Sequence, residues 1–135
     1  MAATGKCLCG AVTFTAEDVE PEVHACHCAM CRSWAGAPML AVNAGKVSFR
    51  GEADLGRYQS SEWAERGFCT RCGSNLFYRL KQDGRYFMCM GAFDDQSGFR
   101  MASEIYIDQK PPGYAFAGDH PRQTRDEFMA SLPQS

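Results

Sequence analysis

The sequence predicts a mostly-β protein in which small antiparallel sheets carry zinc-binding cysteine knuckles, with a short helix near the C-terminus. Three observations predict this class: apolar residues recur in short runs bounded by turn residues, helix signals are confined to two stretches, and seven of the eight cysteines fall into three local groups. Of the 135 residues 45% are hydrophobic and 22% are charged, which is typical of a globular domain with its own core. We therefore expect one zinc-binding domain that spans residues 1–135.

The first expected elements are strands. In residues 12–16 apolar side chains alternate with threonines, the pattern of a half-buried strand. Because Cys7-Leu8-Cys9-Gly10 comes directly before this strand, the first cysteine pair should lie in a turn. Residues 39–42 and 47–49 are β-rich runs on either side of the turn-forming segment 43–46, and we expect them to form a hairpin.

A second hairpin is expected from residues 76–80 and 86–90. The pair Asp83-Gly84 between them supplies the positive-φ residue that a tight reversal prefers. Residues 105–107 read as a further strand, and Pro111-Pro112-Gly113 should then end regular structure because proline cannot donate to a β-ladder.

Helix signals are few. Residues 33–36 can form one or two turns at most. Near the C-terminus, Thr124-Arg125-Asp126-Glu127 has the pattern of a capping box. We expect a short helix there, with Phe128 and Leu132 on one face and Pro133 at its end.

Charge and hydropathy exclude two classes of partner. The net charge is −2 and the pI is about 5.9, so the chain lacks the basic excess that binds nucleic acid or anionic lipid. The first five residues show no secretory signal, and no apolar run approaches the roughly 18 residues of a membrane helix. We expect a soluble cytoplasmic protein, and in a reducing compartment clustered thiols bind metal more often than they form disulfides.

Two of the cysteine groups end in the same Cys-Gly step, which permits the turn of a zinc knuckle. Together they supply four soft ligands, Cys7, Cys9, Cys69 and Cys72, for a closed tetrahedral zinc site. Such a site should be structural, and it would clamp two segments about sixty residues apart.

The third group then leaves Cys26, Cys28 and Cys31 in one loop. Three protein ligands and a free fourth position are typical of a catalytic zinc, and three thiolates suit an ion that holds a substrate thiolate.

Spacing alone leaves two alternatives open. A fourth ligand from His24, His27 or His120 would make the second site closed and structural. The second group could also share ligands with either of the other pairs.

Three motifs in this order closely resemble the glutathione-dependent formaldehyde-activating enzyme family, which includes the centromere protein V group. The motifs are Gly5-Lys6-Cys7-Leu8-Cys9-Gly10-Ala11-Val12, Cys26-His27-Cys28-Ala29-Met30-Cys31-Arg32 and Phe68-Cys69-Thr70-Arg71-Cys72-Gly73-Ser74-Asn75-Leu76. The resemblance covers residues 4–107. It implies a small β fold similar to the Rab guanine-release zinc chaperone and methionine sulfoxide reductase B.

The resemblance also implies the same division of the cysteines into a structural and a catalytic zinc site. The activity it implies joins glutathione and formaldehyde into S-hydroxymethylglutathione, a carbon–sulfur lyase reaction. We therefore expect a zinc enzyme with two zinc ions that acts on a small-molecule thiol and a small aldehyde. The alternative is a non-catalytic zinc module that mediates a protein interaction, and an exposed sheet edge would be compatible with a homodimer.

Several other charged and reactive residues are candidates for roles at the site. Arg32 directly follows the third ligand of its group and is our candidate for binding a substrate carboxylate. Arg57 and Arg66 read as solvated surface charges, and Cys89 as a small buried hydrophobe in an apolar strand. Many relatives carry His-Ile where this chain has Glu104-Ile105, and we expect Glu104 to face solvent.

Overall fold

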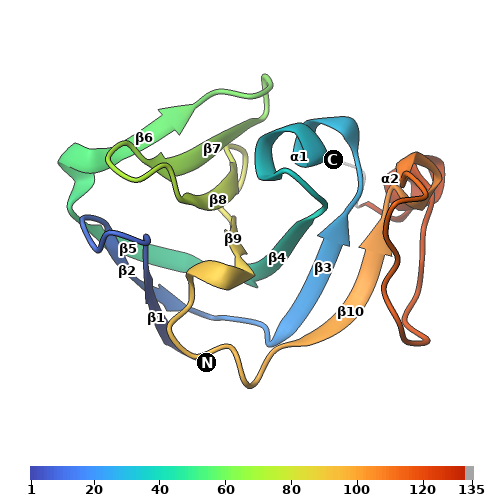
Figure 1. Cartoon of the computed structure of the whole chain (residues 1–135), viewed down its shortest axis with the longest axis horizontal. Helices are drawn as coiled ribbons and strands as arrows, with labels where there is room; N and C mark the ends of the chain where they lie inside the picture. Colours follow the sequence, from blue (N-terminus) through green and yellow to red (C-terminus); the bar gives the residue numbers. More distant parts are fainter. Residues whose placement is uncertain (133–135) are drawn as a thin grey trace.

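The structure is a computed structural model that describes residues 1–132, and within them two β-sheets and two α-helices form (Figure 1). The strands are β1 (Ala3–Lys6), β2 (Thr13–Glu17), β3 (Glu22–Cys26), β4 (Met39–Ala44), β5 (Lys46–Arg50), β6 (Leu55–Tyr58), β7 (Ala64–Cys69), β8 (Asn75–Leu80), β9 (Tyr86–Cys89) and β10 (Arg100–Ile105). The helices are α1 (Ala29–Ala35) and α2 (Arg125–Ser131). The mostly-β class is thus confirmed.

The smaller sheet has the order β1-β2-β5 and is antiparallel, as predicted. The larger sheet has seven strands in the order β10-β3-β4-β9-β8-β7-β6. This sheet differs from the predicted small antiparallel sheets in two ways. It has seven strands, and two of them, β3 and β10, run parallel. A parallel pair needs a long crossover, and here more than seventy residues of the chain separate the two strands.

The predicted hairpin at residues 39–49 is wrong, although both of its strands exist. β4 pairs with β3 and β9 in the large sheet, whereas β5 pairs with β2 in the small one. The chain therefore changes sheets at Gly45, whose N–H donates to the Glu17 carbonyl at 3.0 Å. Strands that switch sheets in this way form the corners of packed sheets.

The second hairpin is confirmed. β8 and β9 pair antiparallel, and Gly84 in the connecting turn has a φ of 72°. The late strand begins earlier than predicted, at Arg100, and ends at Ile105 because Tyr106 adopts the left-handed conformation with a φ of 58°. Residues 107–109 form a 3₁₀ turn instead of extended chain.

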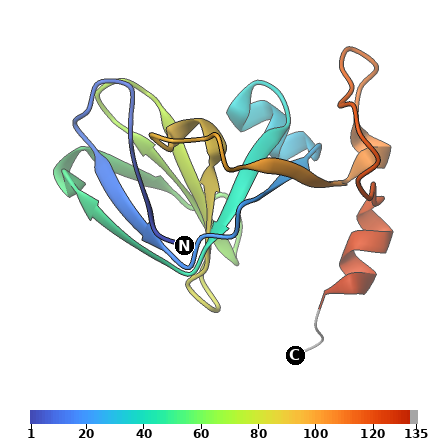
Figure 2. The same cartoon turned by 90° about the horizontal axis from the view of Figure 1, so that it is seen from below.

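Both helices are found. α1 begins four residues before the predicted turn, because the Cys28 sulfur accepts the Cys31 N–H and caps the helix. α2 has the predicted capping box between Thr124 and Glu127. It projects away from the sheets at the β10 end of the molecule (Figure 2). Pro133 lies outside the described residues, and within residues 1–132 no helix is long and apolar enough to cross a membrane.

The main core packs side chains of both sheets together. Phe14 and Ala16 of the small sheet belong to one buried cluster with Leu76, Phe77 and Met88 of the large sheet. Two cysteines, Cys7 and Cys69, are fully buried in the same cluster. The first cysteine group is therefore held by the packing that joins the two sheets.

Candidate metal centres

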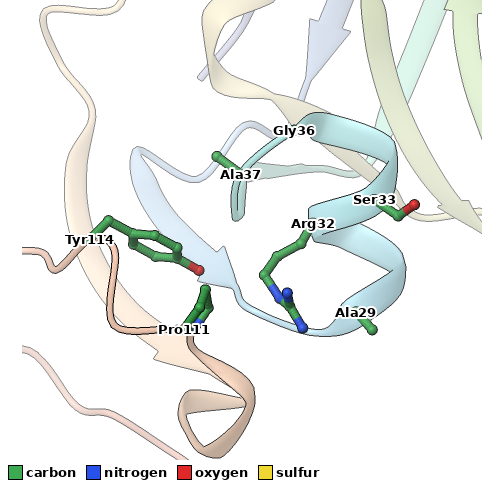
Figure 3. A pocket seen from close by; sticks show the side chains of 7 residues that line it. All are labelled: Ala29, Arg32, Ser33, Gly36, Ala37, Pro111 and Tyr114. Carbon is green, nitrogen blue, oxygen red and sulfur yellow. The ribbon is translucent and has the colours of Figure 1, made fainter.

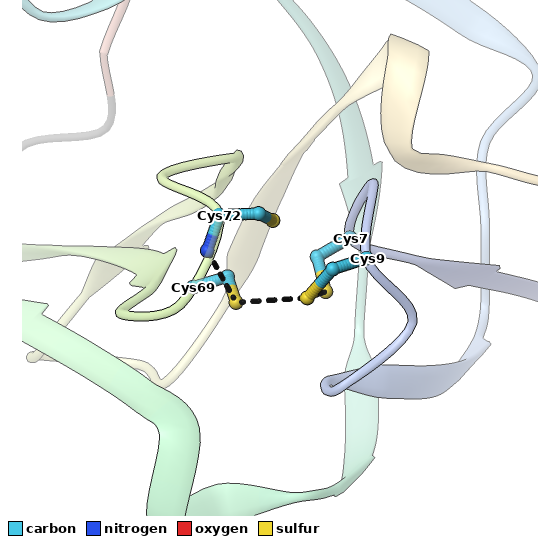
Figure 4. Close-up of side chains that lie close together, drawn as sticks. All are labelled: Cys7, Cys9, Cys69 and Cys72. Atoms are coloured by element: carbon cyan, nitrogen blue, oxygen red, sulfur yellow. Dashed lines mark hydrogen bonds between the residues drawn. The ribbon is translucent and has the colours of Figure 1, made fainter.

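The first cysteine group comes from two turns that face each other (Figure 4). Cys7 and Cys9 lie in the β1–β2 turn, Cys69 ends β7, and Cys72 lies in the β7–β8 turn. The four sulfur atoms lie within 4.8 Å of one another. Sulfur–sulfur distances are 3.7 Å for Cys7–Cys9 and 3.8 Å for Cys9–Cys69.

These distances fit a metal ion of the size of zinc. Four thiolates at the usual zinc–sulfur distance of about 2.3 Å lie about 3.8 Å apart in a tetrahedron. Backbone N–H groups are also aimed at the sulfurs: Val12 donates to Cys7 at 3.3 Å and Arg71 donates to Cys69 at 3.4 Å. Such donors stabilise thiolates, so both the donor set and its surroundings suit a divalent cation.

The two turns are also tied together without metal. The Ser74 hydroxyl accepts the Leu8 N–H at 2.9 Å and lies 3.2 Å from the Cys72 sulfur. Its hydrogen bond to Cys72 lowers the pKa of that thiol to about 5. Gly10 and Gly73 have φ values of 81° and 78°, so both knuckles use the left-handed glycine that the Cys-Gly steps suggested.

The second group is built around the start of α1. Cys26 ends β3, Cys28 caps α1 and Cys31 lies in its first turn, so the three sulfurs lie within 4.8 Å of one another. Hydrogen bonds from Cys26 and Cys31 lower the pKa of Cys28 to about 2, while the contacts of Cys26 with Cys28 and Cys31 raise the pKa of Cys26. Crowded thiols can ionise together only beside a cation, which favours a metal ion at this position.

All three histidines have partners outside the cysteine groups. His24 Nδ1 lies 2.6 Å from the Ser103 hydroxyl, and His27 lies between Tyr114 and Glu104. His120 contacts Glu104 as well. Among the described residues, neither group gains a histidine ligand, so the second group has three protein donors. All eight cysteines, which lie in the described part of the chain, are free of disulfide bonds.

The expectation that Arg66 is a solvated surface charge is wrong. Arg66 is only 3% exposed, whereas Arg57 is a surface residue paired with Glu65 at 2.9 Å, as expected. Arg66 Nη2 donates to the Cys31 sulfur at 3.7 Å. The period-two pattern of β7, which places Arg66 on the same face as the buried Ala64, was the sequence signal that could have revealed its burial.

The expectation that Glu104 faces solvent is also wrong, because its side chain is only 1% exposed. One carboxylate oxygen accepts from His27 Nε2 at 2.7 Å, and the other accepts from Arg122 Nε at 2.8 Å and contacts His120. His27 Nδ1 in turn lies 2.8 Å from the Tyr114 hydroxyl. This network holds the segment after β10 against the loop that carries the second cysteine group.

The partners of Glu104 also determine its acidity. Burial by itself would raise the pKa of Glu104, but hydrogen bonds from His120 and His27 and the charge of Arg122 outweigh it and hold the pKa below its usual range. No local sequence signal marks this carboxylate, because its partners come from distant parts of the chain.

A pocket of about 430 Å³ lies between α1 and the segment after β10 (Figure 3). Arg32 and Tyr114 point into it. Arg32 Nε donates to the His27 carbonyl at 2.9 Å, which anchors the guanidinium beside the cysteine loop. Its terminal nitrogens make no hydrogen bond among the described residues, so they are available to a ligand.

A second pocket, of about 520 Å³, lies beside the first cysteine group, between the β1–β2 turn and the segment that follows β9. It is lined by Cys7 and Asn75 and by Cys89, which also packs against the cluster around Cys31. Burial raises the pKa of Cys89 to about 12, so this half-buried thiol behaves as a hydrophobe, as predicted. No cysteine lines the pocket that contains Arg32.

Comparison with known proteins gives a consistent result. The family model described as glutathione-dependent formaldehyde-activating enzyme matches residues 2–109. A Schizosaccharomyces pombe protein described as an uncharacterized lyase is 35% identical over 130 residues, which cover 95% of each chain.

Two further similarities are more distant. A Halomonas elongata protein, whose name places it among the glutathione-dependent formaldehyde-activating enzymes, is 34% identical over 83 residues, 54% of this chain and 53% of that protein. The crystal structure of a Rhodobacter sphaeroides protein superposes with a TM-score of 0.58 at 20% identity, covering 88% of this chain and 98% of that chain. At this identity the last comparison supports the fold alone.

Proposed function

The chain belongs to the glutathione-dependent formaldehyde-activating enzyme family, and from this we propose that it is a zinc-dependent carbon–sulfur lyase. Its substrates would be a thiol such as glutathione and a small aldehyde such as formaldehyde. The observation that carries the proposal is the second cysteine group, in which three sulfurs converge and no fourth protein ligand joins them within residues 1–132.

The two cysteine groups would have different roles. Cys7, Cys9, Cys69 and Cys72 would hold a structural zinc ion, because four protein sulfurs close a tetrahedral site. Cys26, Cys28 and Cys31 would hold the catalytic zinc ion, which supplies a Lewis acid that keeps a substrate thiol deprotonated.

The reaction balances with these two substrates alone. The thiol sulfur forms a bond to the aldehyde carbon, the carbonyl π-electrons move to oxygen, and the proton lost from the thiol ends on that oxygen. The reverse reaction breaks the same carbon–sulfur bond. By holding one reactant at Cys26, Cys28 and Cys31, the chain would convert a bimolecular step into one within a complex.

Arg32 would bind a carboxylate of the thiol. Its anchored guanidinium points into the pocket beside α1, and the described residues that line that pocket include no acidic one. Paired N–H donors of a guanidinium match the two oxygens of a carboxylate. A peptide thiol bound there would pass the start of α1 to reach Cys26 and Cys28.

The test is the variant Cys28→Ser. Serine is a good helix cap, so α1 should persist while the sulfur ligand is lost. We expect native mass spectrometry to show one metal ion fewer, and NMR exchange spectroscopy to show loss of catalysed thiol–aldehyde adduct turnover. Cys89→Ala is the matched control, because Cys89 belongs to neither group and should leave both readouts unchanged. Loss of the metal with full turnover would instead support a non-catalytic zinc module.

A further inference from the structure

Among residues 1–132, Arg66 is a buried cation without a carboxylate partner. Its neighbour Glu65 pairs with Arg57 and Arg79, on the other face of the strand. The Arg66 guanidinium lies between two aromatic rings, 5.1 Å from the Trp34 centroid and 4.9 Å from the Tyr78 centroid.

Aromatic faces compensate a buried guanidinium only in part. A cation that is removed from water needs a nearby negative charge, and without one its burial is strongly unfavourable. Within the part of the chain that the structure describes, the two polar contacts of Arg66 are with sulfur: Nη2 lies 3.7 Å from Cys31 Sγ and Nη1 lies 4.0 Å from Met39 Sδ. Only the first of these sulfurs can ionise, so the countercharge must come from the second cysteine group.

The formal charges of the metal-loaded second cysteine group indicate a role for Arg66. Three thiolates and a divalent cation leave one net negative charge, and a buried guanidinium in contact with Cys31 cancels it. We propose that Arg66 is the built-in countercharge of the second cysteine group, which makes the metal-loaded group neutral and able to accept an anionic thiolate as its fourth ligand. Arg66 is thus a specificity-determining residue that favours a thiolate over water. This inference rests on the proposed function.

Without Arg66, the incoming thiolate would meet a site that is already negative and poorly screened. Charges a few ångströms apart interact strongly enough at a partly buried site to change affinity at least roughly tenfold. The affinity for a neutral fourth ligand should change much less. The contribution of Arg66 is therefore measurable as a loss of thiol affinity with little loss of metal.

The experiment compares Arg66→Met with the wild type. The matched control is Arg79→Met, because Arg79 also lies over an aromatic ring, at 5.1 Å from the Tyr86 centroid, but forms no hydrogen bond to a sulfur. Each full-length protein is loaded with cobalt(II), counted by native mass spectrometry and titrated with glutathione. The cobalt absorption bands report the fourth ligand without any turnover.

We expect Arg66→Met to bind glutathione at least roughly tenfold more weakly than wild type, with Arg66→Lys in between and Arg79→Met unchanged. Equal glutathione affinity in Arg66→Met and wild type, with two metal ions in each, would overturn this inference and leave the proposed function intact. A wild type that binds only one metal ion would overturn both. If Arg66→Met does not fold, Arg66→Gln, which is also uncharged, takes its place with the same criteria.

Discussion

Glu104 shows how one buried carboxylate organises the surroundings of the second cysteine group. It joins β10 to the histidine between two of the cysteines and to two residues of the C-terminal segment. Hydrogen bonds to a charged group contribute more than neutral ones when the group is buried. Part of the stability of this region therefore depends on a single negative charge.

The variant Glu104→Gln removes that charge and keeps the size of the side chain. We expect a loss of about 2 kcal/mol in the free energy of unfolding at pH 7, because three donors, on His27, His120 and Arg122, lose their anionic acceptor. Urea unfolding of the metal-loaded proteins measures it. Arg57→Met, which changes a surface pair, should cost less than about 1 kcal/mol.

The stability difference between wild type and Glu104→Gln should also depend on pH. The pKa of Glu104 in the folded protein lies below its ordinary value of 4.5, so its charge stabilises the folded state fully above about that pH. The stability difference between wild type and Glu104→Gln should shrink as the pH falls from 4.5 through the folded pKa. A difference that stays constant between pH 7 and pH 3 would contradict this account.

Arg32 gives a prediction about substrate recognition. Arg32→Met should raise KM for glutathione at least roughly tenfold with kcat nearly unchanged, because a carboxylate–guanidinium contact is lost. 2-Mercaptoethanol carries no carboxylate, and its KM should be the same in both proteins. An equal rise for both thiols would mean that the variant perturbs the cysteine loop instead of a carboxylate site.

Residue-scale prediction succeeded where the signal was local. The grouping of cysteines follows from spacings of one or two residues, and each knuckle ends at the glycine that it requires. Arg66 and Glu104 were misjudged because their partners lie far along the chain: Cys31 is 35 residues from Arg66, and His27 is 77 residues from Glu104. Such pairs depend on the fold, which the local pattern does not specify.

At the scale of elements, the first cysteine group joins the two sheets. The β1–β2 turn belongs to the small sheet and the β7–β8 turn to the large one, so a metal ion there cross-links them. We expect Cys9→Ser to lose one metal ion and several kcal/mol of stability, because structural zinc contributes on the order of 10 kcal/mol. Native mass spectrometry and urea unfolding check this. Cys9 is exposed, so the cost of a cavity is absent, and an unchanged stability would contradict a structural role.

Strand β7 gives a second prediction at this scale. A Cβ atom at Gly67 would lie 2.1 Å from the ring of Phe77, which is fully buried and cannot move aside. Gly67→Ala should therefore cost about 1–3 kcal/mol in the free energy of unfolding. Gly91→Ala, where a Cβ meets nothing within 4 Å, is the control and should change stability little. Similar values for the two variants in urea unfolding would show that β7 and β8 are not packed this tightly.

The hairpins show what sequence can and cannot predict about elements. The β8–β9 hairpin was predicted because its turn residues lie next to the strands they connect. The strands β4 and β5 were found but paired wrongly, since period-two alternation looks the same whether consecutive strands pair with each other or enter different sheets. Which strands pair with each other depends on which apolar side chains the complete fold buries.

At the scale of the whole molecule, the parallel pair β3–β10 brings the two halves of the chain to one site. Cys26 lies opposite Ile105 in this register, one residue beyond Glu104. The segment after β10 then returns over α1 and forms one wall of the Arg32 pocket. The second cysteine group and the Arg32 pocket therefore lie on adjoining segments: the end of β3, α1 and the chain after β10.

The most direct test of this account is the zinc content of the purified full-length protein, measured by native mass spectrometry together with elemental analysis. The account predicts two zinc ions per chain, with all seven grouped cysteines protected from alkylation. A single zinc ion, with Cys26, Cys28 and Cys31 freely alkylated, would contradict a resident catalytic metal.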